Sequence, residues 1–222
     1  ELRNVVAEKF TTENGIPTEA HQVLVSSGGK HCLFNALAAI VDDGDEVLIP
    51  SPYWTSYPEM VTLVGGVPVL VEASYESGYR ITPDQLRAAI TPRTRAMIIN
   101  SPTNPTGVVY SRQELEAFAD VIAEAGIYVL SDELYEKITY DGNQHVSIGS
   151  FPQLRQLALT INGVSKAFSM TGWRIGYMCG PADVIAAAGK IQGQSASNPV
   201  SVSQRAALAA LTTPEVADDV RQ

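Results

Sequence analysis

Short apolar runs alternate with stretches of helical period along most of this chain, and this alternation constrains the fold more than any other feature. The runs predicted to be strands are Val23–Ser26, Glu46–Ile49, Val67–Val71, Ala96–Ile99, Ile127–Leu130, Ala158–Ile161 and Ile175–Cys179. The helices predicted between them are Lys30–Val41, Tyr53–Leu63, Pro83–Ile90 and Arg112–Ala125, and the segments ELRNVVAEKF and PEVADDVRQ are also helical in pattern. Such alternation predicts an α/β fold of three layers, α/β/α, in which helices cover both faces of a mostly parallel sheet.

The composition indicates one globular domain and excludes several classes of function. Hydrophobic residues make up 45% of the 222 positions and no stretch resembles a linker or a repeat, so residues 1–222 are expected to form a single domain. A net charge of −9 without a run of Lys or Arg argues against nucleic-acid binding. No apolar run approaches the roughly 20 residues of a membrane span, so no membrane association is expected.

The two cysteines and the absence of a leader sequence bear on the compartment. Cys32 and Cys179 lie far apart, outside any CxxC motif or His cluster, so neither a disulfide nor a metal site is expected. We interpret both as small buried residues of a reducing compartment. No segment has the pattern of a signal peptide. The sequence therefore predicts a cytoplasmic protein.

A glycine-rich turn follows the first predicted strand and opens a helix. Its sequence is Ser26-Ser27-Gly28-Gly29-Lys30. Glycines let the backbone approach an anion, the helix N-terminus offers free N–H groups, and Lys30 adds positive charge. A tight strand-to-helix turn also needs glycine, so phosphate binding and a simple turn both remain open at this point.

Two further predicted strands end in polar residues. The loop NSPTNPTG, residues 100–107, contains prolines that stiffen it, so that Asn104 either points at one ligand or bonds its own backbone. Asp132 ends a buried strand, with Tyr135 three residues later. A buried carboxylate is costly unless paired, so Asp132 either faces a cationic partner or caps a helix.

A lysine in an apolar setting follows the next strand. Lys166 lies among Val164, Ala167, Phe168 and Met170 with few charges nearby. Such a setting can lower an amine pKa and make the amine nucleophilic, although a lone lysine is usually a surface charge. Arg174 lies eight residues later and could hold a phosphate through two hydrogen bonds.

Taken together, five segments resemble a known family. These are SSGGKHCL, SPYWTSYP, NSPTNPTG, SDELYEKITYDG and NGVSKAFSMTGWRIGY. They resemble the class I and II aminotransferases of pyridoxal-phosphate fold type I, in particular the bacterial aspartate aminotransferase branch. The resemblance spans essentially the whole chain, and the order and spacing of the segments make it far more specific than any one of them. It implies a PLP-dependent transferase fold and the cofactor pyridoxal 5′-phosphate (PLP).

The resemblance implies a role for each matching residue. Lys166 matches the lysine that forms an aldimine with PLP and moves the substrate proton. Asp132 matches the carboxylate that keeps the pyridine nitrogen protonated. Tyr135 and Asn104 match the pair that hydrogen-bonds the phenolic oxygen, and this asparagine also contacts the substrate carboxylate. Trp54 matches the aromatic residue that stacks on the ring and borders the substrate, although a core tryptophan is the ordinary interpretation.

The remaining matches concern the phosphate, and here the sequence also departs from the family. Gly28, Gly29, Lys30 and Arg174 match the phosphate-binding residues. Many relatives carry a serine three residues before the lysine, where this chain has Gly163. Ser165, directly before the lysine, is not expected to replace that serine.

The resemblance also implies partners and missing parts. Residues 194–199 resemble a segment that reaches a neighbouring subunit, which predicts a homodimer without identifying the contacting residue. The chain matches the PLP-binding large domain only, without the family's N-terminal segment and C-terminal small domain. We therefore expect it to bind PLP but to be a poor transaminase alone.

The leading functional prediction is transfer of an amino group from an L-amino acid, with aspartate favoured, to a 2-oxo acid. Another fold-type-I PLP enzyme, such as a β-lyase or a decarboxylase, is the alternative, because the cofactor-holding residues do not select the reaction. A non-catalytic PLP-binding protein also remains open.

Overall fold

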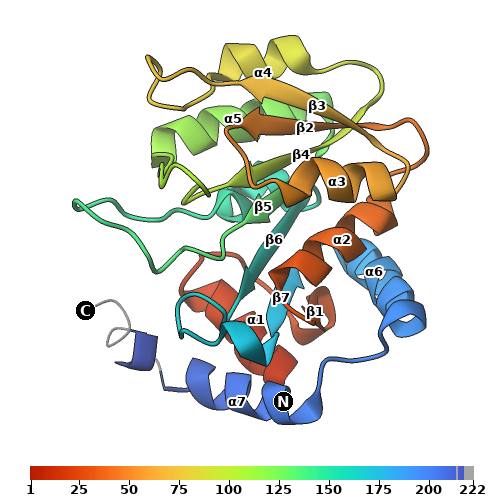
Figure 1. Cartoon of the computed structure of the whole chain (residues 1–222), viewed down its shortest axis with the longest axis vertical. Helices are drawn as coiled ribbons and strands as arrows, with labels where there is room; N and C mark the ends of the chain where they lie inside the picture. Colours follow the sequence, from red (N-terminus) through yellow and green to blue (C-terminus); the bar gives the residue numbers. More distant parts are fainter. Residues whose placement is uncertain (214, 218–222) are drawn as a thin grey trace.

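The computed structural model describes residues 1–213 and 215–217, and its centre is one seven-stranded sheet in the order β1-β7-β6-β5-β4-β2-β3 (Figure 1). The strands are β1 (Val23–Ser26), β2 (Glu46–Ser51), β3 (Val67–Glu72), β4 (Thr94–Asn100), β5 (Tyr128–Asp132), β6 (Ala158–Gly163) and β7 (Gly176–Cys179). β7 is antiparallel to both of its neighbours, and the other adjacent strands are parallel. The prediction of a mostly parallel sheet is confirmed.

The α-helices form the outer layers of the fold. They are α1 (Leu2–Thr12), α2 (Gly29–Ile40), α3 (Ser56–Leu63), α4 (Pro83–Ala89), α5 (Arg112–Ala125), α6 (Ala182–Ser195) and α7 (Ser201–Leu211). Single 3-10 turns are η1 (Ala20–Gln22), η2 (Ile148–Ser150), η3 (Pro152–Leu154) and η4 (Thr171–Trp173). Within the described residues, no helix is long and apolar enough to cross a bilayer.

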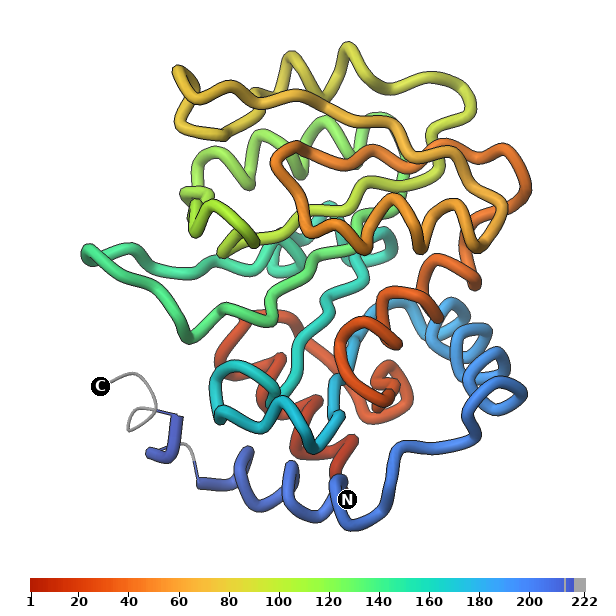
Figure 2. Tube along the Cα trace, viewed as in Figure 1, coloured from red at the N-terminus to blue at the C-terminus, as the bar shows by residue number. Residues whose placement is uncertain are grey.

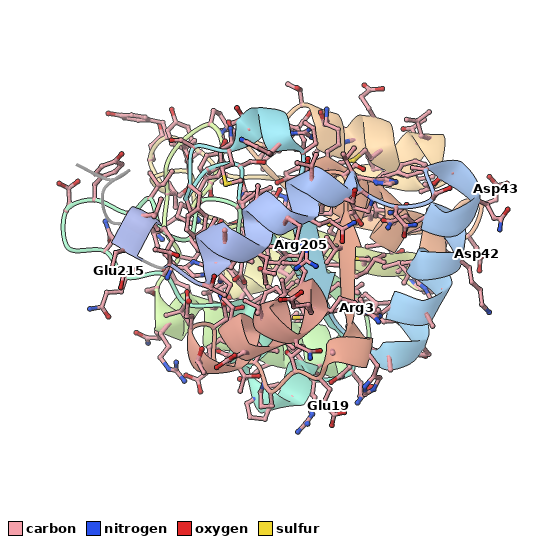
Figure 3. The ribbon with its side chains drawn as sticks, turned by 90° about the horizontal axis from the view of Figure 1, so that it is seen from below. Arg3, Glu19, Asp42, Asp43, Arg205 and Glu215 are labelled. Carbon is pink, nitrogen blue, oxygen red and sulfur yellow. The ribbon has the colours of Figure 1, made fainter. Side chains whose placement is uncertain are left out.

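Alternating side chains of the strands fill two apolar layers, one on each face of the sheet. Ile98 of β4 packs in the layer beneath α2, α3 and α6, whereas its neighbours Met97 and Ile99 pack in the layer beneath α4 and α5. At the β1–β7 end, a third cluster beneath α1 and α7 contains Phe10 and Tyr177. α1 and α7 lie side by side, and Arg205 donates to Glu1 at 2.6 Å (Figure 3). The predicted three-layer α/β/α architecture is confirmed.

Element boundaries differ from the sequence prediction by a few residues. The helix predicted to begin at Tyr53 begins at Ser56, and the strand predicted to end at Leu130 continues to Asp132. The sequence prediction did not include α6 and α7. Glycines inside α6 lower its intrinsic helix propensity, but its apolar face packs into the core and stabilises the helix. Of the predicted helix PEVADDVRQ, residues 215–217 are helical and the others lie outside the described part of the chain.

The topology brings several strand ends to one edge of the sheet. β1, β4, β5 and β6 run in the same direction, so their carboxyl ends lie together, and antiparallel β7 begins there. Gly176 opens β7 directly against the glycine-rich turn: a Cβ at Gly176 would lie 2.4 Å from the carbonyl carbon of Gly28. Glycine is therefore required where β7 passes this turn. In open α/β sheets this edge is where ligands bind.

Candidate functional site

A cavity of about 260 Å³ opens at this edge of the sheet. The predicted site residues that line it are Gly29, Lys30, Trp54, Asn104, Asp132, Tyr135, Lys166 and Arg174. Gly28, the remaining predicted residue, lies next to it in the turn before α2. A slightly larger cavity of about 290 Å³ lies at the opposite ends of β6 and β7, but its lining is mostly apolar and backbone, with Arg155 as its charged residue. The polar groups that can do chemistry therefore converge on the first cavity.

Asp132 is the most unusual group in this cavity. It ends β5, is 4% exposed, and accepts a hydrogen bond from the Tyr57 hydroxyl at 2.7 Å and a long one from the Leu134 N–H at 3.3 Å. Burial raises the pKa of Asp132 to about 6, although both hydrogen bonds oppose that rise. No ion pair to Asp132 is formed within residues 1–213 and 215–217. Its carboxylate thus lacks a cation and borders an open space.

Asn104, Tyr135 and Lys166 come together from three strand ends. The Asn104 amide donates to the Tyr135 hydroxyl at 3.5 Å, and the Lys166 Nζ lies 5.5 Å from the centre of the Tyr135 ring. Asn104 therefore reaches across to the β5 end, and it is Asn100 whose side chain bonds the loop backbone. The Asn100 Oδ1 accepts from the Asn104 N–H at 2.7 Å, while its Nδ2 donates to the Asp132 carbonyl at 2.8 Å.

Arg174 and the glycine-rich turn form a cationic concavity. α2 begins at Gly29, so the first N–H groups of that helix face the turn. Gly28 has a φ of 93°, and a Cβ there would lie 2.4 Å from Nη2 of Arg174. The guanidinium is held by the Thr171 carbonyl at 3.0 Å, and Arg174 adopts a left-handed backbone conformation with φ 56°. Because Gly28 and Gly29 have no side chains, the space between the Arg174 guanidinium and the start of α2 stays open to an anion.

Lys30 and Trp54 form a second contact at the cavity wall. The Lys30 ammonium lies 4.7 Å from the centre of the Trp54 ring, a cation–π contact. Trp54 in turn packs edge-on against Tyr57 at 5.5 Å between ring centres. Lys30 thereby adds positive charge on the side of the cavity formed by the start of α3.

Sequence analysis missed several lining residues, of which Tyr57 matters most. Tyr57 lies three residues after Trp54, and in a helix beginning at Tyr53, as predicted, this spacing would put both side chains on one face. In the structure Trp54 precedes α3 and Tyr57 lies in its first turn. Ser165 and Thr171 also line the cavity, although Ser165 had been left out of the prediction. At Gly163 a Cβ would lie 2.9 Å from the Ile175 carbonyl, so a serine there would require the start of β7 to shift.

Comparison with known proteins gives a consistent result. The model of the family described as aminotransferase class I and II matches residues 1–222. The chain is 49% identical to aspartate aminotransferase of Geobacillus stearothermophilus over all of this chain and 57% of that protein. It is 51% identical to aspartate/prephenate aminotransferase of Cereibacter sphaeroides over 97% of this chain and 54% of that protein. The chain therefore spans little more than half the length of these relatives.

Solved structures share the same arrangement. A double mutant of Thermus thermophilus aspartate aminotransferase superposes with a TM-score of 0.95 at 48% identity, over 99% of this chain and 57% of that chain. An aromatic aminotransferase from Pyrococcus horikoshii superposes equally well at 40% identity, over 99% of this chain and 59% of that chain.

Proposed function

The chain belongs to the class I and II aminotransferase family, and on that premise we propose that its cavity binds pyridoxal 5′-phosphate and serves amino-group transfer. One observation carries the proposal. Asp132 is a buried carboxylate whose pKa is raised by burial and which lacks a cationic partner in the described residues, and it borders the cavity. Such a group is costly unless a ligand supplies the cation, and a protonated pyridine nitrogen does so.

The donor set fits the other parts of the same cofactor. Arg174 and the N–H groups at the start of α2 suit a phosphate, since a guanidinium and a helix N-terminus both favour doubly charged anions. Tyr135 and Asn104 offer hydrogen bonds to a phenolic oxygen. Lys166 supplies the amine that an aldehyde requires, and Trp54 supplies a flat apolar wall.

In the proposed function the residues of the cavity divide the tasks of binding and proton transfer among them. When bound, PLP supplies an electron sink for the substrate carbanion. Asp132 keeps a proton on the ring nitrogen, while Tyr57 holds that carboxylate in place. Lys166 would hold the cofactor and would move a proton at the substrate Cα as a general base and acid. Asn104 and Trp54 border both the cofactor and the substrate.

The proposed substrates are an L-amino acid, with aspartate favoured, and a 2-oxo acid. Support comes from the relatives, which are named aspartate and aspartate/prephenate aminotransferases. We further propose that residues 1–222 correspond to the PLP-binding large domain of such an enzyme. A homodimer and a cytoplasmic location stay predictions from the sequence.

Borohydride reduction of the PLP-loaded protein, followed by peptide mass spectrometry, tests the cofactor assignment. We expect the pyridoxyl group on Lys166 and its loss in Lys166→Ala. Modification of Lys30 or Lys137 in its place would contradict the assignment. In the full-length protein, incubation with aspartate and 2-oxoglutarate then separates the reactions: glutamate formation supports a transaminase, whereas release of CO₂ or of a β-substituent indicates another PLP enzyme.

A further inference from the structure

The last residue of β5 and the turn after it present side chains to two opposite sides. Asp132 and Tyr135, three residues apart, line the cavity. Glu133 and Glu136, also three residues apart, are 0% and 8% exposed and take part in a different cluster of buried polar side chains. A tight turn joins the two pairs, because the Glu136 N–H donates to the Glu133 carbonyl at 3.0 Å. The backbone is shared, so a displacement of one pair displaces the other.

Glu133 accepts hydrogen bonds from residues before and after it in the chain. Its Oε1 accepts from the Ser131 hydroxyl at 2.8 Å and the Ser147 hydroxyl at 2.6 Å. Its Oε2 accepts from the Asn14 amide at 3.3 Å and lies 3.0 Å from Nε2 of His145. The segment between β5 and η2 projects from the sheet and returns (Figure 2), and these contacts tie its two ends together.

Glu136 connects the same turn to the start of the chain. Its Oε1 lies 2.6 Å from the ammonium of Lys9 in α1, and its Oε2 accepts from Asn14 at 2.8 Å. Lys9 also donates to the Asn14 Oδ1 at 2.9 Å. Glu133, Glu136 and His145 lie close enough to share a metal ion, but the Lys9 ammonium already occupies the cation position at Glu136. We call Lys9, Asn14, Glu133, Glu136, His145 and Ser147 the Glu133 cluster.

The charges of the Glu133 cluster are matched within the chain. Burial opposes the charged form of Glu136, but Lys9 and Asn14 outweigh it and lower the pKa of that carboxyl. Burial likewise opposes a charged His145, but Glu133 outweighs it and raises the pKa of the imidazole. With Lys9 and His145 both protonated, two cations balance the two carboxylates.

We propose that Glu133 and Glu136 are positioning residues, which fix Asp132 and Tyr135 from behind and thereby couple α1 to cofactor affinity. The inference rests on the proposed function. α1 contributes no residue to the lining of the cavity, so the coupling is indirect. Its ion pair runs from Lys9 to the turn at 132–136, beside the apolar packing of α1 in the third cluster. A misplaced Tyr135 hydroxyl or Asp132 carboxylate would weaken contacts to the phenolic oxygen and the ring nitrogen, whose strength falls steeply with distance and angle.

The test compares Lys9→Met and Glu133→Gln with Glu116→Gln, an exposed residue of α5 that serves as the matched control. Circular dichroism and urea unfolding establish which variants are folded. PLP affinity and the pH midpoint of the visible absorbance of bound PLP are then measured on folded protein only. We expect about 10-fold weaker PLP binding, as for loss of about 1.4 kcal/mol, and a shifted pH midpoint in both cluster variants but not in Glu116→Gln. Lys9→Arg, which keeps the cation, should recover most of the affinity.

The inference is wrong if the folded cluster variants bind PLP within twofold of the parent and keep its pH midpoint. The Glu133 cluster would then have a structural role only. If Lys9→Met and Glu133→Gln do not fold, the milder Asn14→Ser, which shortens a side chain of the cluster, decides by the same two readouts. Failure of the parent to bind PLP at all would instead contradict the proposed function.

Discussion

Asp132 and Glu133 are neighbours in the chain, both are buried carboxylates, and their surroundings differ in one respect. The Glu133 cluster contains Lys9, whose ammonium lies 2.6 Å from Glu136, and His145, whose pKa is raised beside Glu133, whereas Asp132 has among the described residues a hydroxyl and a long backbone contact but no ion pair. The cavity that borders Asp132 is also where Lys166 and Arg174 lie. A buried charge with an opposite charge beside it in the same chain indicates a structural role. A buried charge without one, next to a cavity, indicates a ligand of opposite charge.

The largest predicted effect concerns the Glu133 cluster, in which Glu136 is paired with Lys9. Glu136→Gln leaves the buried Lys9 ammonium without its close carboxylate, and removal of one partner of a buried ion pair costs about 3–5 kcal/mol. We therefore expect the free energy of unfolding in urea to fall by about that amount. Glu124→Gln removes a carboxylate from an exposed pair with Arg87 and should change it by less than about 1 kcal/mol.

A double variant sharpens this prediction. Lys9→Met with Glu136→Met replaces both charges by apolar side chains, which is often close to neutral in stability. We expect the double variant to be more stable than Glu136→Gln. Equal loss in the two proteins would mean that the hydrogen bonds of Asn14, and not the ion pair, stabilise this region.

Replacement of the Asp132 carboxylate by an amide should raise the free energy of unfolding, whereas the same replacement at Glu136 should lower it. Without PLP, the ionised carboxylate destabilises the fold, and a shift of its pKa from 3.8 to about 6 corresponds to a cost of about 3 kcal/mol. Asp132→Asn should therefore raise the free energy of unfolding of the PLP-free protein at pH 8 by up to that amount. Addition of PLP should reverse the order, since only the parent pairs with the ring nitrogen.

The pH dependence of this effect has a definite sign. The folded pKa of Asp132 is raised, so the folded state binds more protons than the unfolded state between 3.8 and about 6. The contribution of this group to stability is fully present below that window and is lost as the pH rises through it. The advantage of Asp132→Asn should vanish at pH 3.5, and an advantage equal at pH 3.5 and 8 would contradict the assignment.

Arg174→Ala tests the cavity at its phosphate side and should have a smaller effect. Loss of charge-assisted hydrogen bonds worth roughly 1.5–3 kcal/mol should weaken PLP affinity about 10-fold to 100-fold. Arg174→Lys keeps the charge but not the two-pronged geometry, so it should recover only part of the loss. Arg3→Ala, at an exposed position of α1, is the control (Figure 3). Unchanged affinity in Arg174→Ala would place the phosphate elsewhere.

The comparison also shows what the sequence could and could not predict. Most strands were predictable because strands buried on both faces are continuous apolar runs, and the edge strand β3 is such a run although it is partly exposed. Asp132 and Lys166 stood out because polar residues end or follow those runs. The hydrogen bond from Tyr57 to Asp132 joins residues 75 positions apart, and the contact of Asn14 with Glu136 spans 122 positions. Such pairs depend on how the segments that contain Tyr57 and Asn14 are placed near the end of β5. Local pattern carries no information about them, so the sequence did not show which of the neighbouring carboxylates has a basic side chain beside it.

The smallest predicted effect concerns Tyr57, the only side chain of the described residues that donates to Asp132. This hydrogen bond lowers the pKa of Asp132 against the effect of burial, so its removal should raise that pKa further above its ordinary value. Tyr57→Phe leaves the ring in place and removes only the hydroxyl. Because the hydrogen bond stabilises the ionised carboxylate more than the neutral one, the free energy of unfolding should fall by about 1 kcal/mol more at pH 8 than at pH 4.

Urea unfolding at both pH values checks this, with Tyr140→Phe, at a residue 70% exposed, as the matched control. An equal loss at the two pH values would show that Tyr57 only fills space. A pH-dependent loss would show that the Tyr57 hydroxyl stabilises the ionised form of Asp132, as the Lys9 ammonium does for Glu136 in the Glu133 cluster.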